Sequence, residues 1–138
     1  MITSYNTYRQ YIKADIAAYG LQHVSLYNWL RIDQLRFQMR LRRLEYLTNC
    51  CRWRMVSRAV LEAMNHSLAV RMGVTIPKNV FGPGLCLMHR GTVVVSPLAH
   101  VGANCRIHRT IGGIPAVKLS DTGTIEQGGF PATMANGD

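Results

Sequence analysis

The chain has 138 residues, of which 48% are hydrophobic, and a formal net charge of +9. This length suits one domain, and there is no run of about 18 apolar residues that would predict a transmembrane helix. The first residues lack the basic-then-apolar layout of a signal peptide. The cysteines at positions 50, 51, 86 and 105 have the spacing of neither a disulfide framework nor a metal site. We therefore expect reduced thiols and a cytoplasmic location.

Residues 1–72 are predicted to be helical because apolar side chains recur every three or four positions. The three stripes are Tyr8, Ile12, Ile16 and Tyr19; Trp29, Phe37, Leu41, Leu44 and Leu47; and Val56, Val60, Met64 and Leu68. Gly20 is a predicted stop, and a break is expected near Asn49 and Cys50. Because each stripe is amphipathic, we expect these helices to bury their apolar faces against one another or against a partner.

Eight arginines lie between Arg31 and Arg58, where Asp33 and Glu45 are the only acidic residues. Such a block can bind nucleic acid or an anionic membrane surface, but most charge runs are solvated helix faces. Aromatic residues do not alternate with these arginines as a base-stacking platform requires. We therefore expect no nucleic-acid partner, and we keep polyanion binding as a third hypothesis for the function.

Residues 73–113 repeat with a period of six. Phe81, Leu87 and Val93 lead successive hexapeptides, and the pattern resumes after a short insertion at Val101. A period of six fits neither an α-helix nor a single strand. It is typical of a left-handed parallel β-helix, in which three short strands form one triangular coil and the leading aliphatic residues point inward. Two coils bury little surface alone, so a homo-oligomer, the helices, or both must cover them.

The predicted fold class is therefore α+β. An N-terminal helical region spans residues 1–72, a short left-handed β-helix spans 73–113, and an irregular tail spans 114–138. Within this tail, Ile114-Pro-Ala-Val117 can begin one more short strand.

The order of these segments resembles the serine O-acetyltransferase family, and most closely its members from polysaccharide biosynthesis. The resemblance depends on the stretches Phe81-Gly-Pro-Gly-Leu85, His89-Arg-Gly-Thr-Val-Val-Val95 and Val101-Gly-Ala-Asn-Cys-Arg-Ile-His108. It implies a left-handed β-helix, a homotrimer, and transfer of an acetyl group from acetyl-CoA, as co-substrate, to a hydroxyl group. In the serine-specific members, this reaction belongs to cysteine biosynthesis.

The chain departs from that family in two places. Met88 stands where serine-specific members have an aspartate, so the acceptor is either serine, a serine-like molecule or a sugar hydroxyl. The later family coils, which form much of the coenzyme A groove, are not recognisable after Gly113, so the chain resembles a shortened member. We therefore assign no residues to acetyl-CoA binding.

His89 is the predicted catalytic residue. An alcohol attacks a thioester poorly while it keeps its proton, and a neutral imidazole with a pKa of about 6.5 can remove that proton at physiological pH. Backbone N–H groups near Gly91 are expected to stabilise the resulting oxyanion. From its spacing alone, His89 can equally be a surface turn residue without a role.

The remaining candidate side chains have weaker signals. His108 is expected to face a neighbouring subunit or solvent, His100 to lie in an exposed turn, and His23 and His66 to lie on helix surfaces. No histidines and carboxylates have the spacing of a metal site, so no metal is expected.

Cys86 and Cys105 are expected to fill small positions in the core, and a nucleophilic Cys86 is a minor alternative. Asp15 is the carboxylate that can approach His89 from the helical cap. The main alternative to an enzyme is a catalytically inactive, truncated family member that acts only as an assembly partner.

Overall fold

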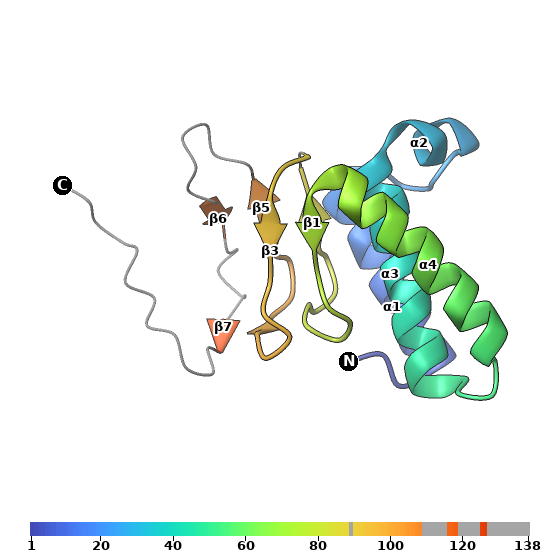
Figure 1. The fold of residues 1–138 in the computed structure, drawn as a ribbon. Helices are drawn as coiled ribbons and strands as arrows, with labels where there is room; N and C mark the ends of the chain where they lie inside the picture. The colour runs from blue at the N-terminus through green and yellow to red at the C-terminus, as the bar shows by residue number, and fades with distance from the viewer. Residues whose placement is uncertain (89, 109–115, 119–124, 127–138) are drawn as a thin grey trace.

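The computed structural model describes residues 1–88, 90–108, 116–118 and 125–126. The helices of this part of the chain are α1 (Tyr5–Ala18), α2 (Leu26–Arg31), α3 (Asp33–Cys50) and α4 (Met55–Met72). The strands are β1 (Val74–Thr75), β2 (Cys86–Leu87), β3 (Val93–Val94), β4 (His100–Val101), β5 (Arg106–His108), β6 (Ala116–Lys118) and β7 (Ile125–Glu126). The helices gather on one side of the molecule, and the strands follow one another away from them (Figure 1).

The helix ends follow from local sequence signals. The Ser4 hydroxyl accepts a hydrogen bond from the Thr7 amide at 3.1 Å and so caps the start of α1. The chain turns at Gly20, where φ is +73°, so the predicted stop is confirmed. Helix α4 ends at Gly73 in the left-handed conformation, with φ at +71°, and leads directly into β1.

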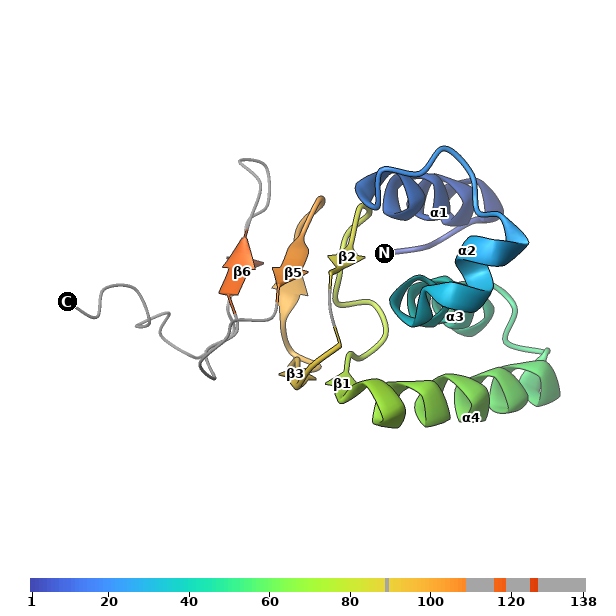
Figure 2. The same ribbon diagram turned by 90° about the horizontal axis from the view of Figure 1, so that it is seen from above.

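Parallel pairing joins strands about 20 residues apart in the sequence. Val74 pairs with Val93, 19 positions later, and Cys86 pairs with Arg106, 20 positions later. An isolated parallel bridge joins Phe81 to a residue that is again 20 positions later. Figure 2 shows β2 next to the helices and β5 further out. Each parallel pair thus joins one strand from each of two successive stretches of chain, and β6 extends the β2–β5 pair in the antiparallel direction.

The backbone approaches itself closely between these stretches at two glycines. A Cβ at Gly82 would lie 2.8 Å from the carbonyl carbon of Gly102, and a Cβ at Gly84 would lie 2.4 Å from Asn104 Oδ1. Gly84 also has a φ of +84°, which other residues rarely adopt. Only glycine therefore fits both positions without a local shift of the chain.

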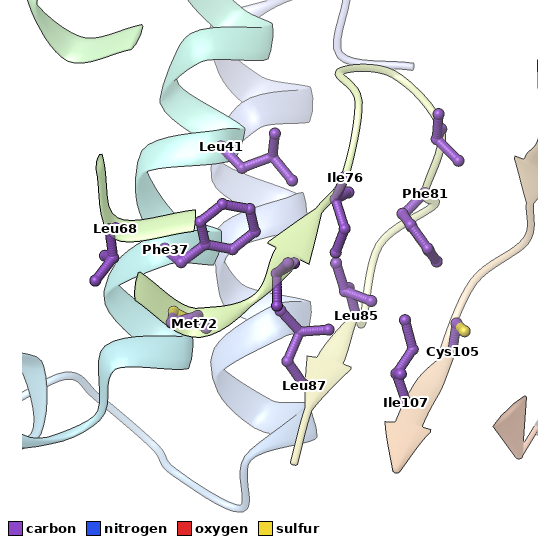
Figure 3. Packing of buried hydrophobic residues seen from close by; sticks show 12 residues of the cluster. Phe37, Leu41, Leu68, Met72, Ile76, Phe81, Leu85, Leu87, Cys105 and Ile107 are labelled. Carbon is purple, nitrogen blue, oxygen red and sulfur yellow. The ribbon is translucent and has the colours of Figure 1, made fainter. Parts of the chain in front are cut away.

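The hydrophobic core lies between the helices and the strands. Figure 3 shows Phe37 and Leu41 of α3 meeting side chains from the first stretch of strands, with Ile107 beyond them. Leu85 and Leu87 are 0% and 2% exposed. Their counterparts in the second stretch, Cys105 and Ile107, are also buried, whereas Val93, Val95 and Val101 of that stretch are only partly buried against the same core. The core is therefore well covered on the helical side and less covered on the far side.

The apolar stripe of α4 differs from the prediction. Leu68 is buried, but Val56, Val60 and Met64 are 79%, 57% and 48% exposed. The N-terminal half of α4 thus leaves its apolar face open in this chain. The neighbouring helices do not cover this half, because α4 contacts β1 and the core mainly through its C-terminal half; cover by a partner, the other predicted alternative, stays a prediction.

Residues 114–138 of the predicted tail include β6 and β7. Strand β6 pairs antiparallel with β5, and β7 pairs antiparallel with β4. The rest of the tail lies outside the described residues. Within the described part of the chain, no helix has the length and apolar character needed to cross a membrane.

Candidate functional site

A buried guanidinium joins the helices to the chain that leads into β2. Arg42 of α3 is 0% exposed, and its guanidinium carbon Cζ lies over the ring of Tyr11 of α1, 4.8 Å from the ring centroid. Its Nε donates to Asp15 Oδ2 at 2.8 Å, and its Nη1 donates to Glu45 Oε2 at 3.0 Å. Burial alone would lower the pKa of Arg42, but the charges of Asp15 and Glu45 and their hydrogen bonds outweigh it and raise the pKa. Arg42 therefore stays charged, and is not part of a solvated helix face.

The same guanidinium also donates hydrogen bonds to backbone carbonyls of the first stretch of strands. Arg42 Nη1 donates to the carbonyl of Phe81 at 2.9 Å, and Nη2 donates to that of Gly82 at 2.6 Å. A further bond from Nη2 reaches Asp15 Oδ1 at 3.3 Å. The five hydrogen bonds match the five N–H donors of a guanidinium. Arg42 is thus fully satisfied, as a buried charge requires.

The two carboxylates beside Arg42 hold backbone amides. Asp15 Oδ1 accepts from the amides of Gly84 and Leu85 at 2.8 and 2.9 Å. Glu45 Oε1 accepts from the Asn79 amide at 2.8 Å. Asp15 thus bonds Arg42 and the backbone before β2, and its approach to His89 stays a prediction. Its position relative to His89 lies outside the described residues.

Side chains of the helices also cover the edge of β2. Gln38 Nε2 donates to the Leu85 carbonyl at 2.6 Å, and Gln38 Oε1 accepts from the Leu87 amide at 3.1 Å. The Tyr19 hydroxyl lies 2.5 Å from Gln38 Oε1 and 3.0 Å from the Leu87 carbonyl. Burial, followed by the proximity of Cys86, raises the pKa of Tyr19, so the hydroxyl keeps its proton and acts as a donor. The backbone just before position 89 is therefore firmly held.

A groove opens beside the end of β2. Its volume is about 490 Å³, and α2 forms one wall while Leu87 and Met88 form another. The α2 wall contributes Tyr27, Asn28 and Arg31. Arg31 donates a hydrogen bond to the Tyr27 hydroxyl, and both side chains are exposed. The groove thus combines an aromatic ring, an amide and a positive charge next to Met88.

The chain is also held just after position 89. Arg90 forms an ion pair with Asp33, the first residue of α3, and Asp33 also pairs with Arg36. Asp33 is 5% exposed, so two arginines surround one buried carboxylate and the surroundings remain positive. His89 itself lies outside the described residues. The fold fixes the residues on both sides of it, at Leu87 and at Arg90.

The other predicted histidines do not meet in one place. His108 contributes its backbone to β5, and its side chain lies outside the described residues. His100 is exposed but belongs to β4, not to a turn. His66 is exposed on α4, as predicted, whereas His23 lies in the segment between α1 and α2 and not on a helix. In the part of the chain that the structure describes, no three histidine, cysteine or acidic residues gather as metal ligands.

Both cysteines predicted for the core are buried. Cys86 is 0% and Cys105 is 2% exposed. Burial raises the pKa of Cys105 to about 11 and also raises that of Cys86, against a smaller opposing effect of Arg106. A thiol with a raised pKa forms little thiolate at neutral pH, which does not favour a nucleophilic Cys86.

Comparison of the chain with known protein families, with curated proteins and with solved structures found no match. The functional argument therefore rests on the chain's own residues.

Sequence reasoning missed the residues that support the site. Gln38 lies in the apolar stripe of α3, between Phe37 and Leu41, and a polar residue at such a position is the signal that could have found it. In the sequence, Asp33 is recognisable only as an acidic residue within the run of arginines. No signal in the sequence indicated that Asp33 pairs with Arg90, 57 positions later.

Proposed function

We propose that the chain is an O-acetyltransferase of the hexapeptide class, with residues 73–113 wound as a left-handed β-helix. The observation that carries this proposal is the parallel pairing of residues 19 to 20 positions apart, with core residues stacked on core residues. A triangular coil of three hexapeptides, with one or two residues added at a corner, has this repeat length. In this proposal, the groove lined by Leu87 and Met88 receives the substrates, and His89, which follows them in the sequence, supplies the imidazole.

In the proposed reaction, His89 acts as the general base. Its imidazole takes the proton of the acceptor hydroxyl while the hydroxyl oxygen attacks the thioester carbonyl of acetyl-CoA. The tetrahedral intermediate breaks its carbon–sulfur bond, and the imidazolium returns the proton to the coenzyme A thiolate. The products are an acetyl ester and free coenzyme A. The Gly91 amide donates to the Met72 carbonyl at 3.3 Å, so it is not free to bind an oxyanion. This corrects the expectation of an oxyanion donor at Gly91 itself.

The groove beside Met88 suits an anionic or polyhydroxylated ligand. Arg31 offers a charged donor for a phosphate or carboxylate, and Asn28 can bond a hydroxyl group. Met88 offers no charge to a substrate amine. We therefore favour a sugar or another hydroxyl compound over serine as the acceptor.

We also propose a homotrimer and a cytoplasmic location. The half-buried valines of the second stretch of strands need further cover, which a neighbouring subunit would provide. The described cysteines are all free thiols, as is usual in a reducing compartment.

The test is acetyl transfer from acetyl-CoA to a panel of acceptors that contains serine, simple sugars and oligosaccharides, followed by release of free coenzyme A. The variant His89→Ala is compared with His100→Ala, which removes an exposed imidazole from β4. We expect His89→Ala to lose at least about 100-fold in kcat, the usual contribution of a general base, and His100→Ala to keep the parental rate. Equal activity of the two variants would refute the role of His89.

A second candidate is an inactive assembly partner that keeps the fold without the chemistry. The partly buried residues Val93, Val95 and Val101 favour it, because an incompletely covered core can receive another chain. Calorimetric titration with acetyl-CoA separates the two functions. Binding that His89→Ala retains supports the enzyme, whereas no binding at millimolar ligand supports the assembly partner.

A further inference from the structure

The turn between α3 and α4 carries exposed apolar and basic side chains together. Trp53 is 80%, Val56 is 79% and Met55 is 64% exposed. Arg52 and Arg54 flank Trp53 and are exposed as well. We call this surface the α3–α4 tip; it comprises Arg43, Arg52, Trp53, Arg54, Met55, Val56 and Val60. It lies at the end of the helices far from the strands (Figures 1 and 2).

A shallow groove continues the tip between the two helices. Its volume is about 420 Å³; Val56, Val60 and Met64 line it on α4, and Arg43 and Arg54 stand at its sides. Apolar side chains therefore lie between arginines over about two turns of α4. This arrangement, with an exposed tryptophan at one end, is typical of a helix that lies at a membrane–water interface.

The described charged side chains of the α3–α4 tip are all positive. Among the acidic side chains that the structure describes, Asp15, Asp33 and Glu45 are buried. The fourth, Glu62, pairs with Lys78 at 2.8 Å. No described acidic side chain is thus left to balance the arginines of the tip. The three buried carboxylates pair with Arg36, Arg42 and Arg90, which do not belong to the tip.

We propose that the α3–α4 tip binds the surface of an anionic lipid bilayer. The arginines would contact lipid phosphates, while Trp53, Met55 and Val56 would enter the boundary between headgroups and acyl chains. A second copy of this chain would bring arginines against arginines, which opposes self-association. Nucleic acid would satisfy the arginines but would leave Met55, Val56 and Val60 exposed to water. A bilayer satisfies both kinds of side chain.

The proposal goes beyond the proposed acetyl transfer. Because the α3–α4 tip and the groove beside Met88 are formed by different ends of α3, the tip can contact a bilayer while that groove stays open.

The experiment is co-sedimentation of the full chain with vesicles of phosphatidylcholine, alone or mixed with phosphatidylglycerol. We expect binding to the mixed vesicles and a decrease as salt is added. Arg54→Gln should weaken binding about fivefold, whereas Arg71→Gln, at the opposite end of the same helix, should change it little. Val56→Ser should weaken binding about tenfold, and Val70→Ser, which is a matched change at a 67% exposed residue, should not.

Fluorescence gives an independent measurement. In the variant Trp29→Phe, Trp53 is the only tryptophan, and its emission should shift to the blue when mixed vesicles are added. No binding to mixed vesicles at low salt would overturn the proposal, as would equal effects of Arg54→Gln and Arg71→Gln. It would also be overturned by tighter binding to an oligonucleotide that Val56→Ser leaves unchanged, or by self-association that Val56→Ser abolishes.

Discussion

The substitution Asp15→Asn tests whether the buried charges join the helices to the strands. The Asp15 carboxylate accepts from Arg42 at 2.8 and 3.3 Å and from the amides of Gly84 and Leu85 at 2.8 and 2.9 Å. Asparagine keeps the shape but removes the negative charge. Its NH₂ group would face donors, because the groups around this side chain are N–H groups.

The expected cost can be worked from these contacts. Breaking a buried ion pair by removing one partner costs about 3–5 kcal/mol. Glu45 remains beside Arg42 at 3.0 Å, so we expect the lower end of this range, about 3 kcal/mol. This corresponds to a roughly 150-fold larger unfolding constant. The melting temperature should fall by about 6–12 °C for a chain of this size.

The assay is urea unfolding followed by circular dichroism, with thermal melts in parallel. Glu62→Gln is the matched control, since it removes a carboxylate whose ion pair with Lys78 is 2.8 Å long but partly exposed. Such a pair contributes at most about 1 kcal/mol. If Asp15→Asn costs no more than Glu62→Gln, the reasoning about the buried cluster is refuted.

Three further outcomes follow from the described geometry. Gly84→Ala should lower the free energy of unfolding by at least about 3 kcal/mol, because it adds a clash with Asn104 to the strain of a positive φ. Gly20→Ala has open space around it and should lower the same quantity by only about 1–2 kcal/mol in the same unfolding assay. Tyr19→Phe should cost about 1–2 kcal/mol in thermal melts, because it removes the hydroxyl that bonds the backbone of β2; an unchanged melt would contradict that bond. The Cys105 thiol has a pKa raised to about 11, so it binds its proton more tightly in the folded chain than in the unfolded one. Its stabilising effect is therefore present at neutral pH and is lost as the pH rises from about 9 to 11. Cys105→Ala should make the free energy of unfolding less dependent on pH in this range, and an equal slope in the two proteins would refute the prediction.

Helical periodicity predicted the helical region well, but not which apolar helix faces are buried. The stripe on α1 predicted a helix that stops at Gly20, and α1 ends two residues before it, at Ala18. The stripe of Val56, Val60 and Met64 was equally regular, yet these residues are exposed. Periodicity reports which residues share a face, whereas burial depends on what lies opposite, and that is a property of the tertiary structure.

The support of the site was harder to predict for a similar reason. Arg42 belongs to a run of arginines that looks uniform in sequence, but it alone among the run's described members is fully buried with five hydrogen bonds. Asp15 was considered as a partner of His89 because acidic residues are scarce. The fold instead requires its charge at Gly84 and Leu85, and a sequence does not reveal which distant backbone amides need an acceptor.

The hydrogen bonds of Gln38 and Tyr19 to Leu85 and Leu87 determine which edge of the sheet can pair with a further strand. On the helical side, side chains already occupy the backbone groups to which another strand would have to bind. This sheet can therefore be extended only beyond β6, the strand at its opposite edge. An additional strand at that edge would need no change in the helices, whereas strand pairing through the β2 edge is blocked by Gln38 and Tyr19.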